Sequence, residues 1–198
     1  IGSTSVKGLN HLVYEIVDNS VDEHLAGHCS EIYVALKKDG SALIRDNGRG
    51  IPVDLHKKGI PAERVIFTTL HAGGKFDDSS YKTSGGLHGV GSSVVNALSD
   101  RMDVKIMKDG VISIDSYERG KPVMELIDGK LPIIGKTKKT GTEVVFFPDE
   151  TIFDTIRFKA SSIRQRLHET AYLNPELTLI FENERDNEEP ITYYEPEG

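Results

Sequence analysis

The sequence predicts an α+β fold: a two-layer α/β sandwich in which helices cover one face of a mixed, mostly antiparallel sheet. Apolar residues recur at helical spacing over Gly8–Ala26. Two Asp-Gly pairs, Asp39-Gly40 and Asp109-Gly110, stand between strand-like segments, as hairpin turns do. Further strand-like segments follow one another without an intervening helix, and this grouping favours α+β over an alternating α/β fold.

The elements follow in order along the chain. The first helix ends at Ala26 because Gly27 is a natural stop. Two short helices flank a glycine-rich stretch over Gly73–Gly91, and Asn174-Pro175 ends the last helix. The predicted strands are Glu31–Lys38, Ala42–Asp46, Met102–Met107, Val111–Tyr117, Pro122–Ile127, Thr142–Phe147, Leu177–Phe181 and Ile191–Tyr194, and the later helices are Ala62–Leu70, Ser92–Leu98 and Ala160–Leu173.

Composition limits the classes of protein that remain. The chain has 198 residues, 37% hydrophobic, and no apolar run approaches the ~20 residues that a bilayer span needs. Its one cysteine, Cys29, cannot form an intrachain disulfide, which favours a reducing, cytoplasmic location. A net charge of −7 argues against a nucleic-acid-binding face. No linker divides the chain, so we expect one domain over residues 1–198, and the absence of an initiator Met suggests a piece of a longer chain.

The first helix carries a polar trio. Glu15, Asn19 and Asp22 lie at positions i, i+4 and i+7, so they share one face of the helix beside the apolar stripe. By itself this trio is equally typical of the solvent side of an amphipathic helix.

The segment Asp46–Pro52 follows a predicted strand directly. Its glycines, Gly48 and Gly50, are typical of an ordinary turn. The same pattern also suits a carboxylate at a strand end that accepts a hydrogen bond from the exocyclic amine of adenine, on a backbone that a flat ring can approach.

The segment Ser84–Gly91 is rich in glycine and leads into a predicted helix. Such a backbone presents N–H donors and the positive end of the helix dipole, which together bind anions. Lys75 could add a charge for a terminal phosphate. A flexible surface loop is the alternative, but long structureless stretches in compact domains are usually lids or binding loops.

Two other patterns do not indicate sites. Gly129–Thr137 resembles a Walker A loop, but it has one residue too many between its glycines and no flanking strand and helix. His24, His28 and Cys29 lie close together, but no second ligand pair with zinc spacing accompanies them.

Taken together and in this order, the three polar segments resemble the Bergerat nucleotide-binding fold of the GHKL ATPases. This superfamily includes type II topoisomerases, heat-shock chaperones, MutL-type repair proteins and sensor histidine kinases. The strings at 14–23, 71–78 (HAGGKFDD) and 84–99 (SGGLHGVGSSVVNALS) look like the ATPase domains of the bacterial gyrase B and ParE family, and the likeness covers essentially the whole chain.

The resemblance implies a role for each matching residue, with ATP and Mg²⁺ as the ligands. Glu15 would be the general base that activates water, and Asn19 would hold Mg²⁺. Asp46 would read the adenine amine, with Thr142 joining through a water and Gly50 leaving room for the ring. The phosphates would be cradled by the remaining positions: Lys75, Tyr81, Lys82, Leu87, His88, Gly89, Val90 and Gly91. Asp22 would be structural.

The resemblance also implies partners and missing parts. The complete enzyme would pair with a gyrase A-type or ParC-type DNA-cleavage subunit and with a second copy of itself, would contact DNA, and would bind ATP-site inhibitors. An N-terminal arm and a transducer domain would lie outside Ile1–Gly198, so this chain alone should turn ATP over slowly. Family members often carry Arg where Ile114 stands here, a departure that bears on aminocoumarin affinity and not on ATP binding. A histidine-kinase-type phosphotransfer module is the alternative, which Glu15 disfavours because such kinases need no water-activating base there.

Overall fold

The elements are described in a computed structural model that covers residues 2–57, 59–69 and 90–198. In chain order they are α1 (Val6–Leu25), β1 (Glu31–Leu36), β2 (Ala42–Asp46), α2 (Ala62–Thr68), α3 (Val90–Ala97), β3 (Ser99–Lys108), β4 (Val111–Glu118), β5 (Lys121–Pro122), β6 (Ile133–Lys136), β7 (Gly141–Pro148), α4 (Ala160–Leu173), β8 (Thr178–Asn183), the 3₁₀ helix η3 (Glu184–Asp186) and β9 (Ile191–Tyr194).

One sheet joins the strands of the described residues. Its order is β5-β4-β3-β7-β2-β1-β8-β9, with β6 paired to β4. The pairing of β1 with β8 is parallel and the other pairings are antiparallel. The prediction of a mixed, mostly antiparallel sheet in an α+β fold is therefore confirmed.

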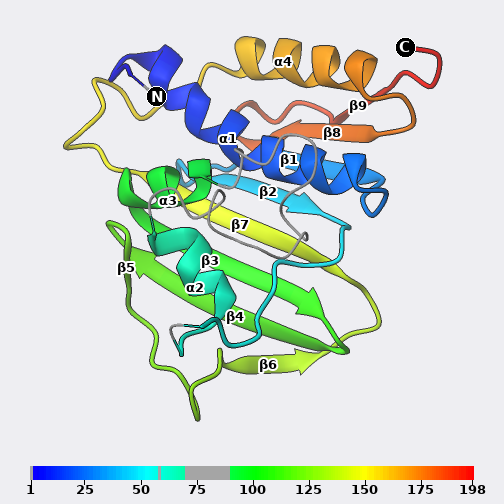
Figure 1. The fold of residues 1–198 in the computed structure, drawn as a ribbon. Helices are drawn as coiled ribbons and strands as arrows, with labels where there is room; N and C mark the ends of the chain where they lie inside the picture. The colour runs from blue at the N-terminus through cyan, green and yellow to red at the C-terminus, as the bar shows by residue number, and fades with distance from the viewer. Residues whose placement is uncertain (1, 58, 70–89) are drawn as a thin grey trace.

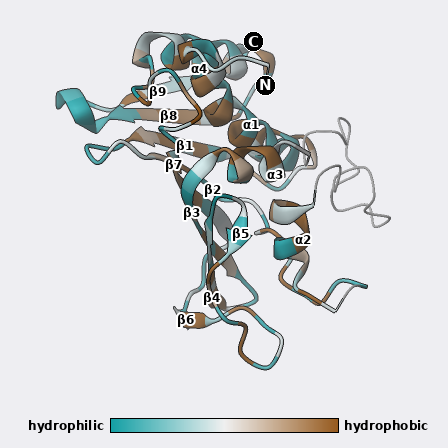
Figure 2. Ribbon diagram, turned by 90° about the vertical axis from the view of Figure 1, so that its left-hand side faces the viewer, coloured by the Kyte–Doolittle hydropathy of each residue, from teal (hydrophilic) through white to brown (hydrophobic). Residues whose placement is uncertain are grey.

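The helices form a layer on one face of this sheet (Figure 1). Within the layer α4 contacts α1, α1 contacts α3, and α3 contacts α2. Figure 2, turned by 90°, shows α1, α2 and α3 on the same side of the strands. The apolar stripe predicted from sequence is the buried side of α1, where Leu12, Val13 and Ile16 are at most 3% exposed. The hydrophobic core lies between the two layers.

The strand register brings the end of β2 to the start of β7. Asp46, the last residue of β2, pairs with Thr142 in β7 although the two residues lie far apart in the sequence. β2 is a central strand beneath α1, so its final carboxylate faces the helix layer. This register creates the site described below.

One predicted strand is wrong. Pro122–Ile127 was expected to be extended through its length, but β5 ends at Pro122. The apolar residues that suggested the strand, Val123 and Ile127, are 48% and 61% exposed, so their spacing reflects no buried face. The segment turns at Asp128 and Gly129, both with positive φ, and the paired strand is β6. β6 falls inside the pattern that resembles a Walker A loop, and no helix follows it, as the rejection of that pattern requires.

Other helix and strand bounds differ by a few residues. α1 begins at Val6 instead of Gly8, and β3 is longer than the predicted strand at both ends. No helix among residues 2–57, 59–69 and 90–198 is long and apolar enough to span a membrane.

Candidate functional site

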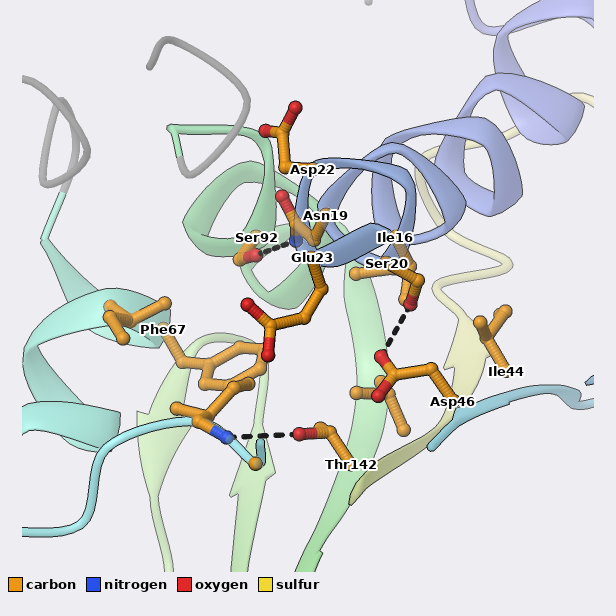
Figure 3. Close-up of a pocket in the computed structure, with 14 residues that line it drawn as sticks. Ile16, Asn19, Ser20, Asp22, Glu23, Ile44, Asp46, Phe67, Ser92 and Thr142 are labelled. Atoms are coloured by element: carbon orange, nitrogen blue, oxygen red, sulfur yellow. Dashed lines mark hydrogen bonds between the residues drawn. The ribbon is translucent and has the colours of Figure 1, made fainter. Parts of the chain in front are cut away.

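A pocket opens between α1 and the sheet, closed at its side by α2 and α3 (Figure 3). Its residues come from helix, strand and turn segments far apart in the sequence. They are Ile16, Asn19, Ser20, Asp22, Glu23, Ile44, Asp46, Gly50, Ile51, Ile66, Phe67, Ser92, Thr142 and Val144. Aliphatic and aromatic walls with a few convergent polar groups are typical of small-molecule sites.

Asp46 is the polar centre of the pocket. Its Oδ2 accepts a hydrogen bond from Ser20 Oγ at 2.6 Å, and its Oδ1 accepts one from the backbone N–H of Gly48 at 2.9 Å. Burial raises the pKa of this carboxyl, and the bonds from Ser20 and Gly48 oppose the rise. The side chain is therefore held in one orientation, facing a pocket whose walls are largely apolar.

Thr142 and Gly50 complete this end of the pocket. Thr142 Oγ1 accepts a hydrogen bond from the backbone N–H of Ile51 at 3.0 Å, which fixes the loop after β2 against β7. Gly50 has a φ of +89°, and a Cβ there would lie 2.9 Å from the carbonyl oxygen of Met107. Glycine is thus required here by the backbone conformation and by the close approach of β3, in addition to any room that it leaves for a ligand.

Asn19 lines the pocket from α1. Its Nδ2 donates to Ser92 Oγ on α3 at 2.5 Å, which orients the amide. Among the described residues no donor bonds its Oδ1. An amide oxygen that is held in place and free of donors is suited to a hard cation such as Mg²⁺.

Glu15 lies one turn before Asn19 on the same helix but outside the pocket lining. Its Oε1 is 3.2 Å from Nε2 of His11, and its Oε2 lies so close to Gly91 that a Cβ there would overlap it. Gly91 belongs to the first turn of α3, so the carboxylate sits at the positive end of that helix. The absence of a side chain at Gly91 allows α1 and α3 to bring this carboxylate to the edge of the pocket.

Sequence analysis missed several pocket residues. Glu23 received no role, yet it lines the pocket and forms a two-pronged ion pair with Arg49, at 3.1 Å from Nε to Oε2 and 2.8 Å from the second guanidinium nitrogen to Oε1. Burial alone would raise the pKa of Glu23, but the hydrogen bonds and charge of Arg49 outweigh it and lower that pKa. Its position one after Asp22 on the polar side of the helix was the available signal.

Ser20 was also missed, although it stands where the apolar stripe would place an aliphatic residue, four after Ile16. A small hydroxyl in an apolar stripe signals a buried partner, here Asp46. Asp22, expected to be structural, lines the pocket.

The remaining expected phosphate-binding residues cannot be placed. They are Lys75, Tyr81, Lys82, Leu87, His88 and Gly89, which lie outside the described residues. Val90 begins α3, as the predicted loop-to-helix junction requires within two residues. Ile114 lies in β4 and does not line the pocket.

A strand-end carboxylate facing a helix that carries Asn and acidic residues, on a sheet covered by helices on one face, defines the class of GHKL-type ATP-binding domains. The sequence model of the family described as "Histidine kinase-, DNA gyrase B-, and HSP90-like ATPase" matches residues 4–152, and the chain belongs to this family.

Individual relatives narrow the resemblance. The chain is 50% identical to the gyrase B protein of Helicobacter pylori J99, a match that covers 98% of this chain and 25% of the relative. It is 54% identical to the gyrase B protein of Thermotoga maritima, with 98% and 30% covered. It is 52% identical to the B component of DNA topoisomerase 4 from Enterococcus faecalis, with 98% and 28% covered. The chain therefore spans less than a third of the length of these relatives.

A solved structure agrees with the fold. The 43K ATPase domain of Thermus thermophilus gyrase B, in complex with an aminocoumarin, superposes with a TM-score of 0.85 at 42% identity, covering 100% of this chain and 49% of that one. The expected resemblance to the gyrase B and ParE family is confirmed.

Proposed function

We propose that this chain is the ATP-binding and ATP-hydrolysing domain of a type IIA DNA topoisomerase of the gyrase B or ParE type. The observation that carries the proposal is Asp46, a carboxylate held by Ser20 and Gly48 and facing a largely apolar pocket. A fixed acceptor among apolar walls suits one exocyclic amine on a flat ring, as adenine offers and guanine does not at the same position. The relatives support the same function.

The pocket assigns complementary tasks to its residues. Asp46 accepts the adenine N6–H, and Ile44, Ile51 and Val144 pack on the ring. Asn19 Oδ1 has the chemistry and freedom to hold Mg²⁺, which neutralises phosphate charge when bound. Glu15, at the pocket's edge, takes the proton of the attacking water as general base. Lys75 and the backbone of Leu87–Gly91 contact the phosphates.

The adenine assignment is tested by comparing ATP and GTP affinity in Asp46→Ala. Loss of a carboxylate acceptor for a buried amine costs roughly 1.5–3 kcal/mol, so calorimetry should show ATP binding weakened about tenfold or more, with the preference for ATP over GTP lost. Unchanged ATP affinity in a folded variant would contradict the assignment.

Asp39→Ala is the matched control for this variant. Asp39 caps its own turn as Asp46 does, accepting the backbone N–H of Ser41 at 2.9 Å, but it does not line the pocket. This control should retain both the ATP affinity and the preference for ATP, so that any loss in Asp46→Ala is assigned to the carboxylate facing the ring.

A further inference from the structure

A second cavity lies away from the nucleotide pocket. It measures about 330 Å³ and shares no lining residue with that pocket. Three segments enclose it: the turn between β1 and β2, the stretch that precedes α4, and η3 after β8. Its lining residues are Lys38, Gly40, Ile156, Arg157, Phe158 and Arg185.

The fold explains why these segments meet. β1 and β8 are the parallel pair of the sheet, and their register ends with Leu36 opposite Asn183. Their carboxyl ends therefore lie at the same edge, which is where ligands bind in parallel sheets. The turn after β1 leads into β2, whose far end is Asp46, so the cavity and the adenine-facing carboxylate lie at opposite ends of β2.

The cavity is lined by cations and by no carboxylate among the described residues. Arg185 is partly buried, and its hydrogen bonds go to neutral oxygens: Nε donates to Asn183 Oδ1 at 3.1 Å, and a terminal nitrogen donates to the carbonyl of Phe158 at 2.9 Å. Burial and the nearby charge of Arg157 lower the pKa of Arg185, although Asp186 and Glu188 act in the opposite direction. This guanidinium is therefore incompletely neutralised by the protein.

The other cations are also poorly compensated. Arg157 contacts Asp186 at a long 3.5 Å, and the other oxygen of that carboxylate accepts from Asn183 at 2.8 Å. Lys38 forms no ion pair within the described part of the chain. The nearby carboxylate of Asp39 is occupied by Ser41. In a chain of net charge −7, gathering like charges around a hollow is unfavourable unless an anion binds there.

We propose that this cavity binds a small phosphorylated ligand, whose phosphate oxygens pair with the guanidinium groups of Arg157 and Arg185 and with the ammonium of Lys38. Guanidinium groups suit phosphate because their planar N–H donors match its oxygens in pairs. The hollow shape and the side chains of Ile156 and Phe158 fit a compact ligand. A nucleic-acid duplex requires instead an extended basic surface, which this acidic chain does not provide.

Pyrophosphate titration of the ¹⁵N-labelled 198-residue chain, followed by NMR, tests the proposal. We expect saturable shifts of the Gly40 amide and of the Nε–H signals of Arg157 and Arg185, distinguishable by position from shifts around Gly50 in the nucleotide pocket. Shifts confined to the nucleotide pocket, or shifts at Gly40 that never saturate, would overturn it.

The double variant Lys38→Gln/Arg157→Gln makes the test specific. Both side chains are exposed, so the fold should persist, and loss of two charge-assisted contacts should weaken binding at Gly40 about tenfold or more. Lys121→Gln/Lys130→Gln removes the same charge from exposed positions elsewhere and should leave the affinity unchanged. Equal weakening in both variants would show a general charge effect and refute the site.

A short DNA duplex, added at the same phosphate concentration, forms the second arm. Weaker shifts than those from pyrophosphate support a small ligand. Stronger shifts from the duplex at Gly40, Arg157 and Arg185 would overturn the small-ligand proposal in favour of a nucleic-acid contact.

Discussion

At the residue scale, Glu15 is set apart from the other acids of α1. It does not line the pocket, it contacts His11 at 3.2 Å, and it lies against the backbone of Gly91. A base placed at the edge of a ligand pocket can act on a water beside the bound phosphates without competing with Asn19 for the metal. Its position suits chemistry more than binding.

Glu15→Gln should therefore separate binding from hydrolysis. The amide keeps the size and hydrogen-bonding reach of the carboxylate but cannot take a proton. In the full-length polypeptide, ATP binding should be unchanged, while the rate of phosphate release should fall by the ~10²–10⁴ typical of general-base loss.

Glu169→Gln on α4, which changes an exposed carboxylate in the same way, serves as the control for Glu15→Gln and should keep the native rate. Native hydrolysis in Glu15→Gln would place the base elsewhere.

At the scale of elements, the contact of α1 with α3 depends on one missing side chain. Gly91 allows Glu15 to approach α3 so closely that an added Cβ would overlap the carboxylate. Ser92, the next residue, bonds Asn19. The two helices thus position the base and the metal-binding amide through adjacent residues of α3.

Gly91→Ala should force these helices apart. Overpacking at such a contact costs roughly 1–3 kcal/mol, so urea denaturation should show a lower free energy of unfolding. Gly135→Ala in β6 is the control, because a Cβ there would meet its nearest atom at 3.7 Å and φ is not positive. If the two variants lose equal stability, the contact between α1 and α3 is not the cause.

The helix α2 is anchored to β4 by a buried charged cluster. Tyr117 Oη donates to Glu63 Oε2 at 2.7 Å, and Arg64 pairs with Asp115 at 2.9 Å. Arg64 also donates to the carbonyl of Met124. Burial, and then the neighbouring Asp115 carboxylate, raise the pKa of Glu63 well above its usual 4.5. Because α2 also carries Phe67 into the nucleotide pocket, this cluster sets the position of a pocket wall.

Glu63 should make the stability of the fold depend on pH. Its folded pKa is above its unfolded pKa, so the folded state binds more protons between the two values. Its contribution is complete below the unfolded pKa of about 4.5 and is lost as pH rises through the folded pKa. Glu63→Gln removes this titration, so its free energy of unfolding should gain on that of the native chain as pH rises.

Urea denaturation across this pH range measures the difference between the native chain and Glu63→Gln. Glu169→Gln should show a constant difference from the native chain over the same range, since that side chain is exposed. A constant difference for Glu63→Gln as well would contradict the raised pKa.

At the scale of the whole molecule, negative charge is concentrated where an anionic nucleotide is proposed to bind. The chain carries a net charge of −7, and the described pocket is lined by Asp22, Glu23 and Asp46 without a lysine or arginine. The positive charge required by a polyphosphate must then come from a divalent cation and from residues outside the described part, such as Lys75 and Lys82.

Chelation of Mg²⁺ should therefore weaken ATP binding strongly while leaving adenosine binding unchanged, because adenosine uses Asp46 and the apolar walls alone. Calorimetric titrations of both ligands with and without a chelator measure this difference. Equal effects on ATP and adenosine would mean that the cation stabilises the pocket itself and not the phosphates.

The sequence by itself determined the fold class, most of the helices and strands, and much of the proposed site. Periodicity defined α1 because an amphipathic helix must bury one face. Glu15, Asn19 and Asp46 were identifiable because each stands in a short local pattern, a helix face or a strand end followed by glycines, whose chemistry depends on few neighbours. Pro122–Ile127 failed for the converse reason: apolar spacing predicts a strand only where the apolar side is buried.

Only the tertiary structure decided which distant residues meet. The hydrogen bond from Ser20 to Asp46, the ion pair of Glu23 with Arg49 and the pairing of Glu63 with Tyr117 join α1, the turn after β2, α2 and β4. The cluster of Lys38, Arg157 and Arg185 likewise depends on the parallel pairing of β1 with β8. Burial and partner distance set the charge state and orientation of such groups. Both arise from packing between segments far apart in the chain, which no local pattern encodes.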